Sequence, residues 1–331
     1  MTIRLLPLLA AALGYIFLPG SVNAIEVARP LDFSQAHPPG SRFMQVRLLG
    51  AVLLASEPVD GFGLRQLSGL AWDADAGLLY ALSDDGYIAH LKPRFDNGLL
   101  AGVEYRAAFA LREADGNPVE GKAADSEALA LRRREDGNGN ELLVSFEQRP
   151  RFVRFTPTGQ WLGEVAIPRQ YTIAANYRST NDSLESVAVD PRHGIVLAPE
   201  QRLRDDPGPT IPIFTPDGRQ WRYTPIDPDH SAIVDMAPAS DGALLVLERR
   251  YKSMFSPIIF AVRRLRLDAE PGSTPPVEEI VRFDNGSDFR IDNFEGIARQ
   301  EGNRYFMVSD DNRSAIQRTI LVCFEIVGPR H

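Results

Sequence analysis

Short apolar segments alternate with turn-forming residues along most of the chain, and they fall into five similar groups. Each group opens with a segment in which a polar or acidic residue precedes small and apolar residues, at 67–73, 126–132, 184–190, 234–240 and 294–300. A second apolar segment follows and closes on an acid, at 78–85, 141–149, 194–202, 243–250 and 304–312. Apolar runs of this length, bounded by turn residues, predict β-strands. We therefore expect five units, each built on a β-hairpin.

The units recur at a nearly constant spacing. At intervals of 59, 58, 50 and 60 residues, the opening position holds Ser68, Glu127, Glu185, Asp235 and Glu295. A turn motif repeats in the same register, because Phe155-Thr-Pro-Thr-Gly returns as Phe214-Thr-Pro-Asp-Gly 59 residues later. Similarity at a fixed period is typical of repeat architectures.

Further strand-like segments give each of the first four units four strands, whereas the fifth unit has three. The segment 46–55 near the N-terminus can supply the missing strand. Four-stranded units arranged radially form a β-propeller, in which the exposed edges are short and protected. The sequence thus predicts an all-β protein, a β-propeller of five four-stranded blades whose ring is closed by an N-terminal strand pairing with the C-terminal blade. A sixth blade without the motif is the alternative.

The first 24 residues have the pattern of a signal peptide. Arg4 precedes an apolar stretch from Leu5 to Leu18, and Val22 and Ala24 form a small-x-small cleavage pattern. The stretch is shorter than the roughly 20 residues that span a bilayer, which disfavours the alternative of a retained anchor. We expect a signal peptide over 1–24, one propeller domain over 25–331, and a periplasmic or secreted protein without stable membrane insertion.

Charge and cysteine content narrow the classes of partner. The formal net charge is −8 and no basic block occurs, which disfavours nucleic acid as a partner. Cations and small-molecule ligands fit this charge better. Cys323 is the only cysteine and lies in an apolar segment, so we expect a buried structural thiol and no intramolecular disulfide. A monomer is expected.

Acidic residues are predicted to converge at one end of the propeller channel. The start of one strand and the end of its antiparallel neighbour lie at the same rim. The opening positions therefore lie beside the five closing acids: Asp84, Glu147, Glu200, Glu248 and Asp310. Carboxylates this close raise one another's pKa unless cations compensate them.

Two kinds of cation can compensate this ring. A hard ion such as calcium takes six to eight oxygen ligands, and the residues predicted to bind it are Asp84, Glu147, Glu200, Asp310 and Asp311. Arginines also follow several closing acids, and Arg149 and Arg202 are predicted to bind an anionic substrate. Glu127, Glu185 and Glu295 are the predicted catalytic carboxylates. The alternative is that the same acids and arginines latch neighbouring blades together.

Other catalytic motifs do not occur in the sequence. No Gly-x-Ser-x-Gly elbow is present, which argues against an α/β-hydrolase serine. The five histidines lack the spacing of a zinc site. His230 is the one histidine beside the acid-bearing face of the repeat, and we interpret it as a loop residue.

Several motifs resemble the phytase-like family, described as esterase-like activity of phytase. They are Leu67-Ser-Gly-Leu-Ala-Trp72, Asp125-Ser-Glu-Ala-Leu129, Ser145-Phe-Glu-Gln-Arg149, Leu184-Glu-Ser-Val187 and Asn293-Phe-Glu-Gly-Ile297. The resemblance extends from about residue 61 to 326. It implies an exported bacterial β-propeller, compared by analogy with calcium-dependent phytases that hydrolyse phosphomonoesters at an acidic channel mouth. The lysines and arginines with which phytases bind phosphate have no residue-by-residue match here.

Three functions follow from these observations. The first is a calcium-dependent hydrolase of a small anionic ester, either a phosphoester or a carboxylic ester. The second is a non-catalytic periplasmic binding or scaffold propeller. The third is a lactonase-like metal propeller, in which an amide oxygen from Asn181, Asn293 or Asn312 joins the carboxylates at one ion.

Overall fold

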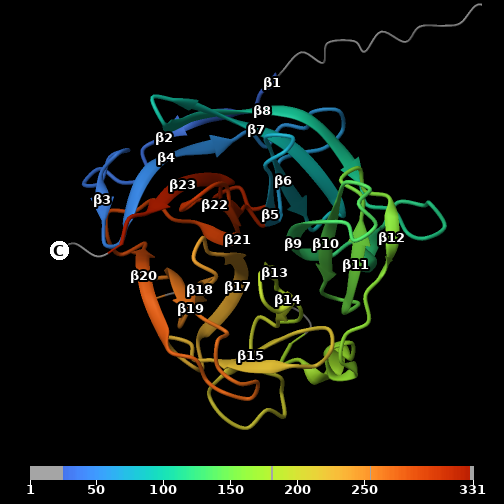
Figure 1. The fold of residues 1–331 in the computed structure, drawn as a ribbon. Coiled ribbons are helices and arrows are strands. Elements are labelled where there is room, and N and C mark those ends of the chain that lie inside the picture. The colour runs from blue at the N-terminus through green and yellow to red at the C-terminus, as the bar shows by residue number, and fades with distance from the viewer. Residues whose placement is uncertain (1–24, 180–181, 254, 329–331) are drawn as a thin grey trace, which may run out of the picture.

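The computed structural model describes residues 25–179, 182–253 and 255–328, which form a five-bladed β-propeller (Figure 1). Five antiparallel sheets surround a central channel, and the first strand of each repeat lies innermost. The prediction of five four-stranded blades is confirmed, and the six-bladed alternative is wrong. The predicted signal peptide over 1–24 lies outside the described residues.

In each of the first four blades, four strands follow one another in chain order from the centre outward. The first blade contains β5 (Leu67–Asp73), β6 (Leu78–Ser83), β7 (Tyr87–Asp96) and β8 (Leu99–Ala110). The second contains β9 (Ser126–Arg133), β10 (Asn140–Phe146), β11 (Arg151–Phe155) and β12 (Trp161–Glu164). The third contains β13 (Ser186–Asp190), β14 (Gly194–Ala198), β15 (Ile211–Phe214) and β16 (Gln220–Tyr223).

The fourth blade contains β17 (Ser231–Pro238), β18 (Leu244–Arg250), β19 (Ile259–Leu265) and β20 (Val277–Asp284). The fifth contains β21 (Asn293–Arg299), β22 (Arg304–Asp310), β23 (Ile320–Ile326) and β4 (Val46–Leu54). Three single-turn 3₁₀ helices lie in the connections, at Gly121–Ala123, Arg169–Tyr171 and Ala174–Asn176. Within the described residues, no helix has the length and apolar character needed to cross a membrane.

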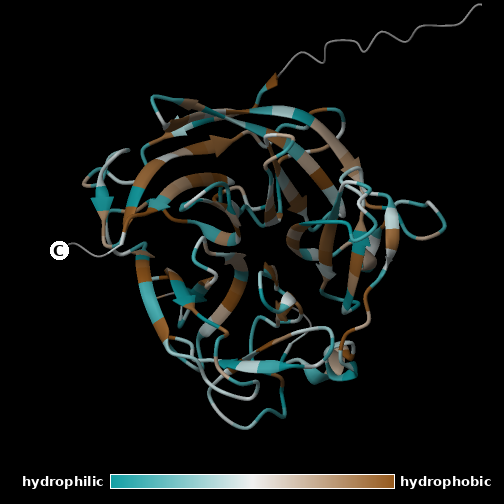
Figure 2. Cartoon of the chain, viewed as in Figure 1, coloured by the Kyte–Doolittle hydropathy of each residue, from teal (hydrophilic) through white to brown (hydrophobic). Residues whose placement is uncertain are grey.

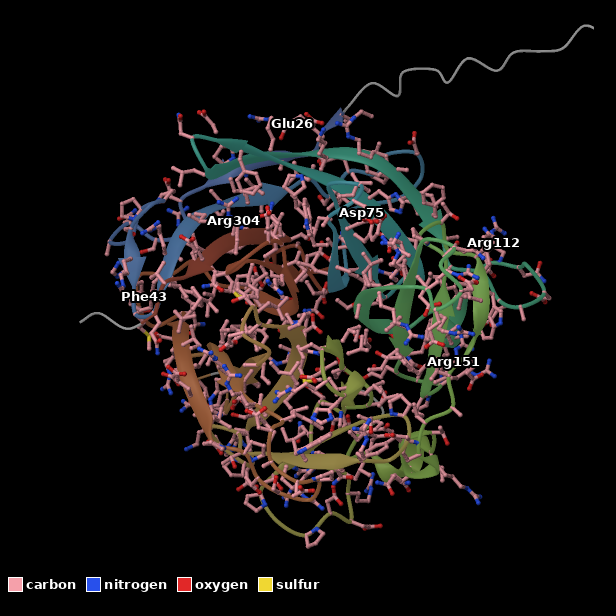
Figure 3. The ribbon with its side chains drawn as sticks, in the orientation of Figure 1. Glu26, Phe43, Asp75, Arg112, Arg151 and Arg304 are labelled. Carbon is pink, nitrogen blue, oxygen red and sulfur yellow. The ribbon has the colours of Figure 1, made fainter. Side chains whose placement is uncertain are left out.

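The two ends of the described chain meet in the fifth blade, as the sequence predicts. Strand β4 pairs antiparallel with β23, placing Val52 opposite Leu321. Shorter N-terminal strands extend this clasp, because β1 (Ile25–Glu26) pairs with β8, while β2 (Ala28–Leu31) and β3 (Arg42–Phe43) pair with β4. Glu26 lies on the outer rim (Figure 3), where its carboxylate accepts a hydrogen bond from the Val103 N–H at 2.9 Å. The N-terminal segment thus joins the fifth blade to the first.

Apolar packing between neighbouring blades explains why the strands are apolar over long runs. The buried hydrophobic residues form five clusters, and each cluster lies between two adjacent blades around the ring. A blade is therefore buried on both faces, so its inner strands carry little of the polar alternation of a half-exposed sheet. Figure 2 shows these hydrophobic positions along the strands around the ring. Cys323 is fully buried in this core, as predicted.

The residues that line the channel show which positions of the five repeats are equivalent. Three consecutive residues from each inner strand line its narrow apolar part, and the middle residue is an alanine in every blade: Ala71, Ala130, Ala188, Ala237 and Ala298. The inner strands approach one another closely here. A Cβ on Gly69 would lie 2.8 Å from the backbone nitrogen of Leu129 in the next blade, so only glycine fits at that point of β5.

This register corrects one of the five opening positions expected from the sequence. Counting back three residues from the alanine leads to Ser68, Glu127, Glu185 and Glu295, but in the fourth blade it leads to Val234. The expected counterpart, Asp235, is one residue too far along. In the same blade Glu248 pairs with Ile233, so the position equivalent to the other closing acids is held by Arg249. The fourth blade therefore places a valine and an arginine where other blades place acids.

Ring closure is expected to contribute strongly to stability. Leu321 is fully buried in β23 and lies opposite Val52 of β4. Replacing Leu321 with alanine leaves a cavity between the first and fifth blades, so Leu321→Ala should lower the free energy of unfolding by about 2–5 kcal/mol in denaturant titrations. Ile316→Ala is the control, because this side chain is 87% exposed and its loss should change stability by less than about 0.5 kcal/mol. Equal effects of the two changes would contradict this account.

Candidate functional site

An acidic cavity of about 310 Å³ lies at the channel end where the inner strands begin. All five blades contribute to its wall. Eight carboxylates line it: Asp84, Asp125, Glu127, Glu147, Glu185, Glu200, Glu295 and Asp310. Among the described residues, Arg249 is the single basic one in the lining, and the uncharged polar ones are Gln66, Ser68, Gln148, Asn293 and Asn312. The predicted convergence of acids at one mouth is therefore present.

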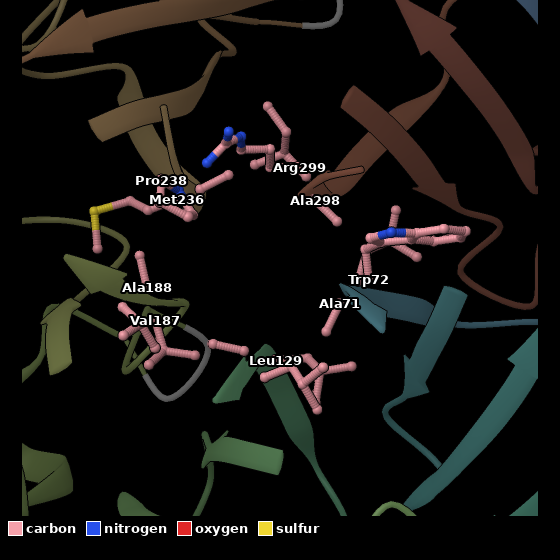
Figure 4. A pocket seen from close by; sticks show the side chains of 15 residues that line it. Ala71, Trp72, Leu129, Val187, Ala188, Met236, Pro238, Ala298 and Arg299 are labelled. Atoms are coloured by element: carbon pink, nitrogen blue, oxygen red, sulfur yellow. The ribbon is translucent and has the colours of Figure 1, made fainter. Parts of the chain in front are cut away.

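Irregularities in strand pairing aim these side chains. The register between the two innermost strands shifts at Ser68 in the first blade and at Glu295 in the fifth, and a similar shift occurs beside Glu127 in the second. A bulge inserts an extra residue and re-aims its side chain, so the bulged residue turns toward the channel. Two to four positions further along, the same strands line the apolar channel shown in Figure 4. The acids thus form a polar mouth above an apolar neck.

Arg249 compensates one side of the cavity. Its Nη1 donates to Glu295 Oε1 at 2.8 Å and to Asn293 Oδ1 at 2.8 Å, and its Nη2 donates to Glu200 Oε1 at 2.6 Å. Burial acts to lower the pKa of Arg249, but Glu295 and Glu200 outweigh burial and raise it, so the guanidinium stays charged. A guanidinium has five N–H groups, and about two remain beyond these three contacts. One basic residue thus bridges the third, fourth and fifth blades.

The opposite side of the cavity has no such partner. Asp125, Glu127 and Glu147 each offer an oxygen within 4.8 Å of the other two. Among the described residues that line the cavity, no basic side chain faces this group from the first and second blades. Asp84 Oδ1 is buried without a hydrogen-bond partner in the described chain. Negative charge is therefore concentrated on the side away from Arg249.

Burial and mutual repulsion shift the titration of these acids. Burial raises the pKa of Glu147 to about 7, and burial also raises the pKa of Asp310 to about 7. Burial raises the pKa of Glu200 to about 8, although Arg249 acts in the opposite direction. The pKa values of Asp84, Glu127 and Glu185 all lie well above their usual range because of burial and neighbouring carboxylates. Without a cation, several of these groups hold protons near neutral pH.

The donor set fits a hard divalent cation. Two oxygens bound to one calcium at about 2.3–2.6 Å are at most about 5 Å apart, a limit that Asp125, Glu127 and Glu147 satisfy. The orphaned Asp84 Oδ1 is a further oxygen of the same kind. For the lactonase-like alternative, Asn293 Oδ1 already accepts a bond from Arg249, Asn312 lines the cavity, and Asn181 lies outside the described residues.

The structure brings together most of the residues predicted from the sequence. The three predicted catalytic acids and four of the five predicted metal ligands line the cavity, and the exception is Asp311. Asp311 pairs with Arg65 at 2.8 Å and accepts a bond from the Gln66 N–H, so it faces away. Arg149 is exposed and is not part of the lining. Arg202 donates to the Gly208 carbonyl and lies 3.7 Å from Asp229, so its role in binding stays a prediction, like that of Arg149.

Two further acids of the expected ring act as latches. Asp235 Oδ2 accepts a hydrogen bond from the Ile297 N–H at 2.7 Å and so ties the fourth blade to the fifth. Glu248 accepts bonds from the Tyr223 hydroxyl at 2.5 Å and from Arg263 at 2.9 Å, which ties the third blade to the fourth. The acids at the channel mouth thus divide into two sets, one that latches blades and one that lines the cavity.

Asp125 and Arg249 are the charged lining residues that sequence reasoning left out of the predicted site. Asp125 lies two residues before Glu127, and its counterparts Gln66 and Asn293 line the cavity in the same way. Arg249 is recognisable only when its blade is aligned through the channel alanine. Both residues could be found only from the strand register, and an error of one residue in matching the five repeats hides it.

A model of the family described as Phytase-like, esterase-like activity of phytase, matches residues 63–313. The chain belongs to this phytase-like family. The match spans all five hairpins that carry the acidic cavity, while β4 and β23 of the closing blade lie outside it. No curated protein matches the chain. Membership in the phytase-like family, the propeller fold and the geometry of the mouth together support a hydrolase-type propeller in general.

The raised pKa values predict an unusual pH dependence of stability in the absence of metal. Carboxyls that titrate near 4 in the unfolded chain bind protons up to about pH 7–8 in the fold, so the folded state binds more protons between these limits. The unfolding free energy of chelator-treated protein should therefore fall as pH rises from about 5 to 8. Thermal unfolding across this range measures it.

Calcium should reverse this trend, since a cation favours the ionised acids. The gain in melting temperature on adding calcium should therefore be larger at pH 8 than at pH 5. A metal-free protein that becomes more stable over the same range would contradict the assignment. The carboxyls with lowered pKa, such as Asp136 and Asp217, titrate below this window and do not obscure it.

Proposed function

We propose that this protein is an exported, divalent-cation-dependent phosphoester hydrolase whose reaction takes place in the acidic cavity. The observation that carries the proposal is charge asymmetry: uncompensated carboxylates on one side face a partly buried arginine on the other. A phosphoester needs both, a cation for one of its oxygens and a guanidinium for another. Membership in the phytase-like family supports the same class of reaction.

Asp125, Glu127 and Glu147 are the proposed cation ligands, with Asp84 and Asp310 as further oxygen donors on the same side. When bound, calcium would polarise the phosphoryl oxygen and lower the pKa of a bound water. The acids themselves orient the cation and exclude other charges. Their convergence from the first, second and fifth blades means that no single blade forms the site.

Glu185 is the proposed general base. It is 8% exposed, lines the cavity between the two sides, and lies on the inner part of the third blade. Burial and the neighbouring carboxylates raise its pKa, which makes an ionised Glu185 a stronger base than an ordinary carboxylate. Glu200 and Glu295 instead hold Arg249, whose remaining N–H groups would donate to the phosphoryl oxygens.

A non-catalytic binding propeller is the second candidate, and the latches formed by Asp235 and Glu248 favour it. The two candidates make different predictions for Glu185→Gln. A hydrolase should lose activity by about 100-fold or more on phosphate monoesters, because a general base contributes that much. A scaffold should show no turnover in the wild type and altered stability in the variant.

The measurement is kcat/KM of the calcium-loaded protein, with thermal unfolding of the same samples. Glu135→Gln is the matched control, because its side chain is 86% exposed and lies far from the mouth in the hairpin of the second blade. Activity should also disappear on chelation and return with calcium. Turnover that survives both chelation and Glu185→Gln would overturn the proposal.

The role of Arg249 is tested by comparing two arginines. Arg249→Gln should raise KM for phosphate monoesters strongly, since it removes the guanidinium from the cavity and leaves Glu200 and Glu295 uncompensated. Arg149→Gln tests the arginine predicted from sequence, and we expect a change of less than about threefold because Arg149 is exposed outside the lining. A larger effect at Arg149 than at Arg249 would return the substrate-binding role to Arg149.

A further inference from the structure

A second cavity of about 580 Å³ adjoins the acidic cavity and shares four of its residues: Glu200, Arg249, Asn293 and Asn312. We call it the annex. Its remaining lining comes from the mouth-side loops of the third, fourth and fifth blades, and includes Gln201, His230, Tyr251, Ile258 and Gln317. A molecule whose reacting group lies against Arg249 can thus extend into the annex.

The lining of the annex is unsuited to a further phosphate group. Asp182, Glu200 and Asp229 contribute negative charge. Arg249 is already bonded to two glutamates, and among the described lining residues no other arginine or lysine is present. Tyr251, Ile258 and the glutamines offer apolar contact and neutral hydrogen bonding. The annex therefore fits a neutral or cationic alcohol and repels a polyanion.

His230 is held in a fixed orientation at the wall of the annex. Its Nδ1 lies 3.0 Å from Asp227 Oδ1, and this hydrogen bond lowers the pKa of Asp227. The backbone is tied as well, because the Tyr251 N–H donates to the His230 carbonyl at 3.0 Å and the Ser231 N–H donates to the Asp227 carbonyl at 2.8 Å. A carboxylate on Nδ1 selects the ring form that carries a proton there.

The other ring nitrogen, Nε2, lies on the opposite edge of the imidazole and has no hydrogen-bond partner in the described part of the chain. This arrangement of carboxylate, imidazole and free nitrogen is the one that serves proton transfer in enzymes. The Nε2 atoms of His90 and His193 have a structural role, because they lie 2.8 Å from the backbone carbonyls of Pro157 and Leu267, respectively. The Nε2 atom of His230 has no comparable role in the fold.

We propose that the annex binds the leaving alcohol of the substrate and that His230 protonates it. The inference rests on the proposed hydrolase function and assigns its leaving-group side. Water attacks phosphorus and loses a proton to Glu185, the bond from phosphorus to the alcohol oxygen breaks, and that oxygen keeps the electron pair. His230 Nε2 gives its proton to this oxygen, and exchange with solvent restores both groups.

Most of the charged groups that face His230 are acidic. Asp227 contacts the ring, and Asp229 and Asp182 line the same cavity together with Glu200. The positive groups are Arg249, which is engaged with glutamates, and Arg250, which acts on Asp227 from β18. Tyr251 lines the same cavity from the loop after β18. Acids thus outnumber free cations around the imidazole.

The test compares two leaving groups in the calcium-loaded, full-length mature protein. The alcohol of p-nitrophenyl phosphate leaves without a proton, whereas that of glycerol phosphate needs one. His230→Gln should lower kcat/KM for glycerol phosphate by about 100-fold and change that for p-nitrophenyl phosphate by less than about threefold. Equal losses on both substrates would overturn the role of His230. His37→Gln, at a histidine stacked on Phe289 and outside the lining of both cavities, is the control and should leave both rates unchanged.

Two further experiments test the proposed role of the annex and of His230. If His230→Gln does not fold, Asp227→Asn tests the same step, because it removes the carboxylate that orients the ring and should weaken glycerol phosphate hydrolysis selectively. Wild-type protein should also prefer glycerol phosphate to inositol hexakisphosphate, and the reverse preference would overturn the proposed chemistry of the annex. Hydrolysis of neither p-nitrophenyl phosphate nor glycerol phosphate by the wild type would instead overturn the proposed function as a whole.

Discussion

The apolar interfaces between blades are the interaction on which the rest of the structure depends. Eight carboxylates around one cavity repel one another, and five buried hydrophobic clusters hold them in place. Because both faces of every blade are buried, polar side chains are confined to strand ends and outer edges. The inner strands begin at the same rim, so their polar ends meet there. Packing thus concentrates charge at the mouth.

Breaking the five-fold similarity makes the mouth asymmetric in charge rather than a uniform acidic ring. The fourth blade replaces two acids with Val234 and Arg249, and the first replaces one with Ser68. The arginine neutralises the side formed by Glu200 and Glu295 and leaves the opposite side for a cation. In the proposed hydrolase, a phosphoester would have a positive group on either side, which a symmetric ring could not offer.

The mouth-side loops add a level of specificity that the blades do not encode. Loops after β14, β18 and β22 and the segments before β13 and β17 line the annex, and they place His230 beside the cavity. Loops vary more freely than packed strands because they carry few core contacts. If the proposed function holds, members of this propeller family would share a mouth and differ in the alcohol they accept.

The sequence by itself determined the number of blades, the closure of the ring through β4 and the convergence of acids such as Glu127 and Glu185 at one mouth. These features follow from apolar periodicity and spacing, which each strand carries locally. Tertiary structure alone decided that Asp311 turns away toward Arg65, that Asp235 is a latch and that Arg249 is the basic residue of the site. A bulge or a one-residue shift in strand pairing re-aims a side chain. Register depends on contacts between strands, so the sequence of a single strand does not reveal it.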